Sequence, residues 1–309
     1  MLKCFGNYLL VGISVCCLSA YTINDNSAEN YAYYSDYFVF IADDATTPLV
    51  IPLDINWSVS DTGYSSEFKA WYGTPKNWPI SYHTENTAAS PAKTPNESWE
   101  HKNGPSFQFD SVQRNITVKI KGAPRLEVTV PEKSTWVQMP AKNTPKEIYG
   151  CRTTVTIKTK KRTGWMIYER IRWTKETVRE FGDFAAFFWL PLIVDGDFYH
   201  FEQHRGEQTA TKWSLQKEKI VVETLPSFTL NIVRTVKDSQ SGRKNIPKEV
   251  QLLAKPWDLD LMMRSKGEQV GYGAKFPNGL AYYRQSLLTS TKSSSQKGYG
   301  MLELILEDD

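Results

Sequence analysis

The chain has 309 residues, of which 40% are hydrophobic and 23% are charged. That is enough apolar material for one large domain or two ordinary ones, so the composition excludes a wholly disordered chain. A formal net charge of +3 rests on 37 basic and 34 acidic residues, and so balanced a chain gives no electrostatic reason to expect a nucleic acid partner.

The first twenty residues have the pattern of a signal peptide. Lys3 is the only charge ahead of an apolar run from Tyr8 to Ala20, which ends in small residues. A helix that spans a bilayer needs about 20 apolar residues. The run therefore predicts cleavage near Ala20 and export to the periplasm or the extracellular space, without a stable transmembrane anchor. An uncleaved anchor and a lipoprotein signal are the alternatives.

Cysteine usage agrees with a removed leader. Cys4, Cys16 and Cys17 lie within it, and only Cys151 remains after cleavage. A single cysteine forms no internal disulfide, and the chain has no Cys/His spacing typical of zinc sites. We expect a mature fold that depends on its core, without a cysteine-based metal site.

The first half of the chain alternates apolar and polar residues over short stretches, which predicts β-strands. The expected strands are 37–41, 49–53, 66–72, 106–110, 115–121, 125–130, 152–159 and 164–173. Pro52 places the second of them at a sheet edge or a bulge. Residues 81–95 are rich in Ser, Thr, Asn, Ala and Pro and predict a long loop. Residues 160–163 predict the turn of a hairpin.

A second series of strands follows a polar connector at 174–182. The expected strands are 184–194, 198–205, 210–215, 219–225, 229–236, 249–255, 259–265, 280–289 and 300–306. Asp195 and Gly196 between two apolar runs are a strong hairpin signal. No stretch has the apolar spacing of a helix. The sequence predicts an all-β protein, with two consecutive antiparallel β-barrels or curved β-sandwiches at 28–173 and 184–309 after the signal peptide at 1–20.

The most concentrated polar pattern lies at 198–204. On a strand, His200, Glu202 and His204 point to one face. They could contact a ligand, exchange protons or bind a metal. The alternative is a plain solvent-facing side, with Tyr199 and Phe201 turned inward.

A second candidate lies at 165–173, where Trp165, Ile167 and Glu169 share a face. A carboxylate on an apolar face is costly unless it is paired. Burial of a carboxyl raises its pKa, which suits a general acid. Glu169 is therefore the candidate acid, and Arg170 would assist it. A Glu–Arg pair or a Glu at a barrel mouth is the structural alternative.

Aromatic residues make up 13% of the chain, a content that suits both pleated sheets and apolar binding sites. Trp165, Tyr168 and Trp189 are the expected lining of an apolar site. Trp71 and Tyr72 flank a Gly/Pro turn, and such a loop either grips an apolar ligand or covers a core.

The order of motifs from 164 to 306 resembles a known family. The stretches are Phe187-Phe-Trp189 with Asp195-Gly196, Gln203-x-Arg205-Gly206, Ser241-Gly242 before Pro247, Leu259-Asp260-Leu261, and Gly298-Tyr299-Gly300 before Glu303. This resembles the two-barrel, lipocalin-like family of carotenoid 1,2-hydratases, AttH-type proteins and fungal Diels–Alderases. Ile246 replaces a Tyr of the family's pattern. Where many members have an Asp/His pair, this chain has Glu169 and no His.

The resemblance implies a protein that binds an apolar, isoprenoid-like or lipid-like small molecule, with hydratase or cyclase chemistry as an open question. It implies no cofactor. The alternatives are a non-catalytic carrier of lipid-like ligands and a surface or carbohydrate-binding module. The sequence does not predict the oligomeric state.

Overall fold

The computed structural model describes the β-rich parts of the chain from residue 31 onward. The described residues are 31–44, 49–60, 63–71, 80–88, 98–100, 106–110, 115–119, 126–129, 137–139, 146–157, 159–174, 187–204, 207–237, 245–265, 274–275, 281–290 and 298–306. Their regular elements are strands, apart from one short 3-10 turn, η3 at Lys255–Trp257. The all-β prediction is confirmed for these residues. The predicted leader and the connector at 175–182 lie outside them.

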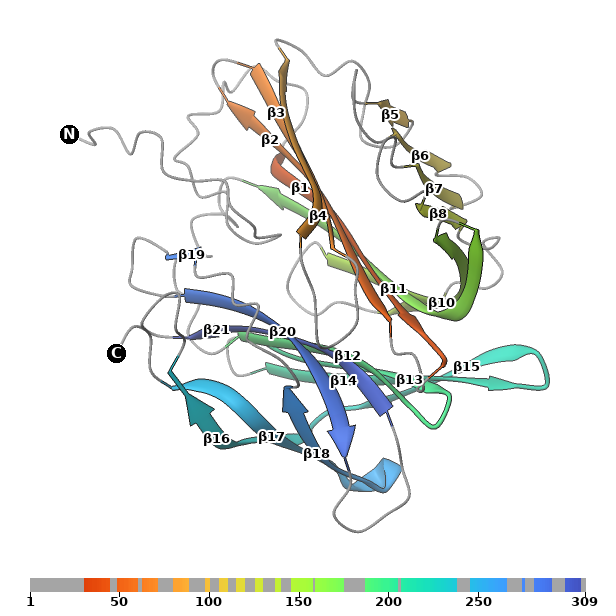
Figure 1. The fold of residues 1–309 in the computed structure, drawn as a ribbon, viewed down its shortest axis with the longest axis vertical. Coiled ribbons are helices and arrows are strands. Elements are labelled where there is room, and N and C mark those ends of the chain that lie inside the picture. The colour runs from red at the N-terminus through yellow and green to blue at the C-terminus, as the bar shows by residue number, and fades with distance from the viewer. Residues whose placement is uncertain are drawn as a thin grey trace. The chain divides into compact units, whose positions relative to one another are not determined.

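The strands form two antiparallel sheets (Figure 1). The first sheet contains β1 Tyr31–Ala42, β2 Val50–Ser60, β3 Gly63–Trp71, β4 Ile80–Ala88, β5 Ser98–Glu100, β6 Ser106–Asp110, β7 Asn115–Lys119, β8 Leu126–Thr129, β9 Val137–Met139, β10 Lys146–Ile157 and β11 Lys160–Thr174. Its order is β4-β3-β2-β1-β11-β10-β8-β7-β6-β5, with β9 on β10.

The second sheet contains the strands after residue 186. They are β12 Phe187–Val194, β13 Asp197–His204, β14 Glu207–Gln216, β15 Lys219–Leu225, β16 Thr229–Val236, β17 Ile246–Ala254, β18 Leu259–Ser265, β19 Ala274–Lys275, β20 Ala281–Ser290 and β21 Gly298–Leu306. Their order is β15-β14-β13-β12-β21-β20-β18-β17-β16, with β19 on β20.

The two sheets repeat one strand plan. In each, four consecutive strands form a meander, and the first strand of the meander pairs on its other side with the last strand of the sheet. That strand is β11 in the first sheet and β21 in the second. The chain divides into two units along these lines. The first unit consists of residues 1–40, 51–71 and 80–182. The second unit consists of residues 41–50, 72–79 and 183–309.

The hairpin predicted at Asp195-Gly196 is confirmed. Val194 pairs with Asp197, and the two residues between them have φ angles of 51° and 90°. Two positive φ angles define the type I′ turn, whose twist matches that of the flanking strands. The turn between β14 and β15 has the same form, with positive φ at Lys217 and Glu218.

Two local predictions are wrong. The β10–β11 hairpin turns between Ile157 and Lys160, which pair with each other. Lys160 to Thr163 therefore lie in β11. Residues 81–88 were expected in a loop, but they form most of β4. This strand pairs residue by residue with β3 at the end of the sheet. Its backbone pairing does not need apolar side chains, so no hydrophobic alternation marks it.

The prediction from Pro52 that its strand lies at a sheet edge is wrong. β2 lies between β1 and β3 and is therefore not an edge strand. Its pairing with β3 begins at Leu53, one residue after Pro52. The missing N–H of Pro52 thus removes no bond from that pairing.

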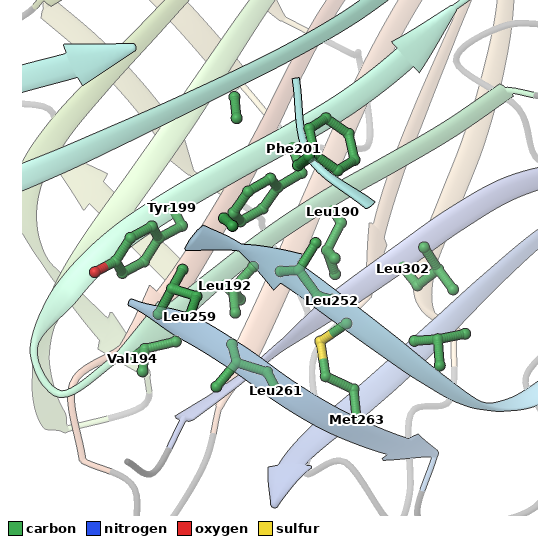
Figure 2. Close-up of a cluster of buried hydrophobic side chains, with 14 of the residues drawn as sticks. Leu190, Leu192, Val194, Tyr199, Phe201, Leu252, Leu259, Leu261, Met263 and Leu302 are labelled. Carbon is green, nitrogen blue, oxygen red and sulfur yellow. The ribbon is translucent and has the colours of Figure 1, made fainter. Parts of the chain in front are cut away.

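The core of the second unit is an apolar cluster between the central strands of its sheet and the strands β17 and β18. Strands β12, β13 and β21 contribute from one side, and β17 and β18 from the other (Figure 2). Its members include Leu190, Leu192, Val194, Tyr199, Phe201, Val250, Leu252, Leu259, Leu261, Met263 and Leu302. These side chains are inaccessible or nearly so, and the space between the strands that carry them is filled by the protein's own residues.

Leu252 and Leu215 form a matched pair for a test of this core. Leu252 is fully buried, whereas Leu215 is 50% exposed. We expect Leu252→Ala to lower the free energy of unfolding by about 2–5 kcal/mol, because it leaves a cavity. Leu215→Ala should change it by no more than about 0.5 kcal/mol. Urea unfolding measures both, and equal effects would contradict the assignment of the core.

Candidate functional site

Four neighbouring strands of the second unit are buried on both faces. The core face of β21, β12, β13 and β14 carries the apolar cluster described above. We call the opposite face the mixed face. It consists of Trp189, Ile193, Phe198, His200, Glu202, Thr211, Trp213, Tyr299, Met301 and Glu303, and apart from Glu202 each is no more than 5% exposed. An ordinary antiparallel sheet leaves its second face in water, so this burial requires an explanation.

The strand register sets the mixed face out in rows. Glu303, Trp189 and Glu202 are direct cross-strand neighbours. In the next row His200 lies opposite Thr211. Directly opposed residues have Cβ atoms about 4.5–5.5 Å apart. Four polar groups thus share this face with aromatic rings.

His200 is the most deeply buried titratable group of the predicted 200–204 pattern. It is 1% exposed, its ring lies 5.2 Å from that of Trp189 in an edge-on arrangement, and its Nε2 lies 4.0 Å from Oε2 of Glu202. The solvent-facing alternative is wrong for His200. Tyr199 and Phe201 do turn to the core face. The side chain of His204 lies outside the described residues.

Tyr299 fixes one end of the mixed face. Its hydroxyl donates to the carbonyl oxygen of Ala42, with the Asp44 carbonyl 3.4 Å away. Ala42 and Asp44 belong to the same unit, which includes residues 41–50. A Cβ added at Gly300 would overlap the Pro191 carbonyl oxygen. Glycine therefore allows β21 to approach β12 closely enough to place Tyr299.

Glu169 lies on β11 of the first unit. It is 4% exposed and shares its face with Trp165 and Ile167, which are fully buried. Ile148 lies directly opposite it on β10. The shared face predicted for 165, 167 and 169 is thus present, and the described neighbours of Glu169 along this face of β11 and directly opposite on β10 are apolar.

The other predicted residues of this region are distributed differently. Tyr168 lies on the opposite face of β11 from Glu169, where its ring stacks on that of Phe38 at 4.5 Å. The Arg152 guanidinium lies 5.1 Å from the Trp165 ring centre, a cation–π contact. The side chains of Arg170 and Trp71, and all of Tyr72, lie outside the described residues.

The last strands of the two sheets carry the same pattern. Each strand carries an aromatic residue, then an aliphatic residue, then a glutamate at every second position. In β11 these are Trp165, Ile167 and Glu169, and in β21 they are Tyr299, Met301 and Glu303. The two carboxyl-bearing residues are 4% and 3% exposed. Sequence reasoning missed Glu303 as a candidate. The repeated aromatic-x-aliphatic-x-Glu spacing is the signal that could have found it.

Cys151 offers no nucleophile. It is fully buried, and this burial raises the pKa of its thiol well above the ordinary value. A thiol kept protonated is unreactive.

The described part of the chain has no helix long and apolar enough to cross a membrane.

Solved structures share this fold. A putative AttH from Nitrosomonas europaea aligns over 90% of this chain and 93% of its own, with a TM-score of 0.60 and 10% identity. Kievitone hydratase from Nectria haematococca covers 90% of both chains, with a TM-score of 0.51 and 12% identity. CghA, solved with Sch210972, covers 90% of this chain and 89% of its own, with a TM-score of 0.51 and 10% identity.

These similarities confirm the resemblance at the level of the fold, over nearly the whole chain rather than its second half alone. No family model and no curated protein matches the sequence.

The Tyr299 hydroxyl is open to a direct test. Tyr299→Phe leaves the buried Ala42 carbonyl without this donor, and we expect a loss of about 1–3 kcal/mol in the free energy of unfolding. The control is Tyr199→Phe, whose ring lies in the core cluster; it should cost less than Tyr299→Phe. Equal losses in the two variants would show that the hydroxyl of Tyr299 contributes nothing specific.

Proposed function

We propose, for a chain with the fold of AttH, kievitone hydratase and CghA, that it is an exported protein that binds an apolar, isoprenoid-like or lipid-like small molecule. We further propose that it acts on this molecule as a hydratase or cyclase, with Glu169 as the general acid. The observation that carries the proposal is the burial of Glu169 among apolar side chains.

The burial of Glu169 is hard to explain by stability alone. A carboxyl removed from water costs free energy unless it is compensated, and a packed apolar residue would stabilise a strand at this position better. Burial favours the protonated form of a carboxyl. A protonated carboxyl shielded from water can donate a proton to an alkene or a carbonyl.

The proposed reaction balances without a cofactor. For hydration, the Glu169 proton is transferred to one carbon of a double bond, and the oxygen of water bonds to the other carbon. The proton released by that water returns to the carboxylate. For cyclisation, a second double bond of the same molecule replaces water as the nucleophile, and proton loss restores an alkene.

The buried aromatic residues favour a small-molecule site over a surface module. A carbohydrate-binding surface needs exposed rings, whereas Trp165, Trp189 and Trp213 are no more than 1% exposed. The lipid-like carrier needs the same aromatic surroundings but no acid. It is therefore the alternative that an experiment on Glu169 separates.

Glu169→Gln is the discriminating substitution. The compound that co-purifies with the chain is extracted and incubated with fresh protein in water labelled with heavy oxygen. A hydratase incorporates the label, and a cyclase changes the compound's chromatographic retention at constant mass. We expect Glu169→Gln to lower either rate by about 10²-fold or more, with the affinity for the compound unchanged.

The matched control is Glu218→Gln, in the exposed β14–β15 turn, which should keep the full rate. A native chain that binds the compound without converting it would establish the carrier. A rate that Glu169→Gln leaves intact would remove Glu169 from the mechanism.

A further inference from the structure

The mixed face of the second unit contains a buried donor without an acceptor. Trp213 is fully buried on β14, and its indole Nε1–H has no hydrogen-bond acceptor within the part of the chain that the structure describes. Buried indole N–H groups usually find a partner. In the same unit, the indole Nε1–H of Trp257 has such a partner and donates to Oε2 of Glu223 at 3.1 Å.

The surroundings of Trp213 define what could bind there. Phe198 lies directly opposite on β13, with its ring 5.4 Å away. Thr211 precedes Trp213 by two residues on the same face, and His200 lies opposite Thr211. The neighbourhood is thus mostly aromatic, with one imidazole and one hydroxyl beside the indole.

Charge narrows the ligand further. The mixed face contains Glu202 and Glu303 but no Lys or Arg among its described residues, so it offers no fixed cation for an anionic ligand. A neutral oxygen, such as that of a carbonyl, ether or hydroxyl group, can accept the indole hydrogen without such a cation. The aromatic neighbours favour an otherwise apolar molecule.

We propose that the mixed face of the second unit is a ligand-binding site in its own right, for an apolar molecule whose neutral acceptor oxygen is bound by the Trp213 indole N–H. The inference rests on the proposed function only for the apolar class of the ligand. Its observations come from the second unit and do not involve Glu169.

The test uses two probes that differ by one oxygen. Acetylnaphthalene has a carbonyl oxygen, and ethylnaphthalene has the same rings and carbon chain without it. We expect the full-length chain to bind the ketone more tightly. Trp213→Phe, which keeps an aromatic ring but removes the donor, should weaken ketone binding about three- to tenfold and leave the affinity for ethylnaphthalene within twofold.

Trp257→Phe is the control, because its indole lies in the same unit and is already bonded to Glu223; it should change neither affinity. Glu218→Gln, in the exposed β14–β15 turn, should also change neither. The assay measures binding and no turnover, so failure of the catalytic proposal does not affect its result. Equal weakening of both probes by Trp213→Phe, no weakening of either, or no ketone binding by the native chain would overturn the inference.

A measurement on the native chain covers a variant that fails to fold. The ketone should move one solvent-protected indole N–H resonance downfield in a nitrogen–proton correlation spectrum, as a new hydrogen bond does. Ethylnaphthalene should not. An indole spectrum that responds identically to the two probes would contradict the proposed hydrogen bond.

Discussion

The burial of β21, β12, β13 and β14 on both faces is the constraint on which the rest of the second unit depends. One face packs against β17 and β18 and supplies the apolar core. A strand with a full core on one side has no need of a second apolar face for stability. The mixed face is therefore free to carry His200, Thr211 and Glu303 at a cost in desolvation that the core offsets. The apolar face thus stabilises the fold, and the mixed face carries the residues that could contact a ligand.

The repeated strand plan extends this constraint to the first unit. β11 and β21 each close their sheet by pairing with the first strand of the meander. Each is buried on both faces along the stretch that leads to its glutamate, residues 164–169 in β11 and 298–303 in β21. Both carry a glutamate four residues after an aromatic side chain, with nearly equal burial. The two carboxyls thus occupy equivalent positions in the repeated strand plan, which makes Glu303 a candidate site residue of the same kind as Glu169.

Sequence patterning was informative where one physical signal dominates. Asp195-Gly196 predicted a hairpin because few residues adopt positive φ in succession, and the structure shows a type I′ turn there. Strands 229–236 and 259–265 have the predicted bounds. The position of Glu169 beside Trp165 and Ile167 also followed from alternation alone.

The failures have equally specific causes. β4 is polar, and only its pairing with β3 makes it a strand. The polar side of β13 was compatible with solvent because alternation identifies two faces but not what covers each. The burial of His200 and the unpaired indole N–H of Trp213 both depend on tertiary packing, which the sequence pattern does not show.

Native mass spectrometry of the purified chain, before and after incubation with a total lipid extract, tests the central claim most directly. The account predicts a complex heavier than the polypeptide by one or more small organic molecules, which solvent extraction releases and which carry a neutral oxygen on an apolar skeleton. A chain that retains the mass of its polypeptide alone under both conditions would contradict it.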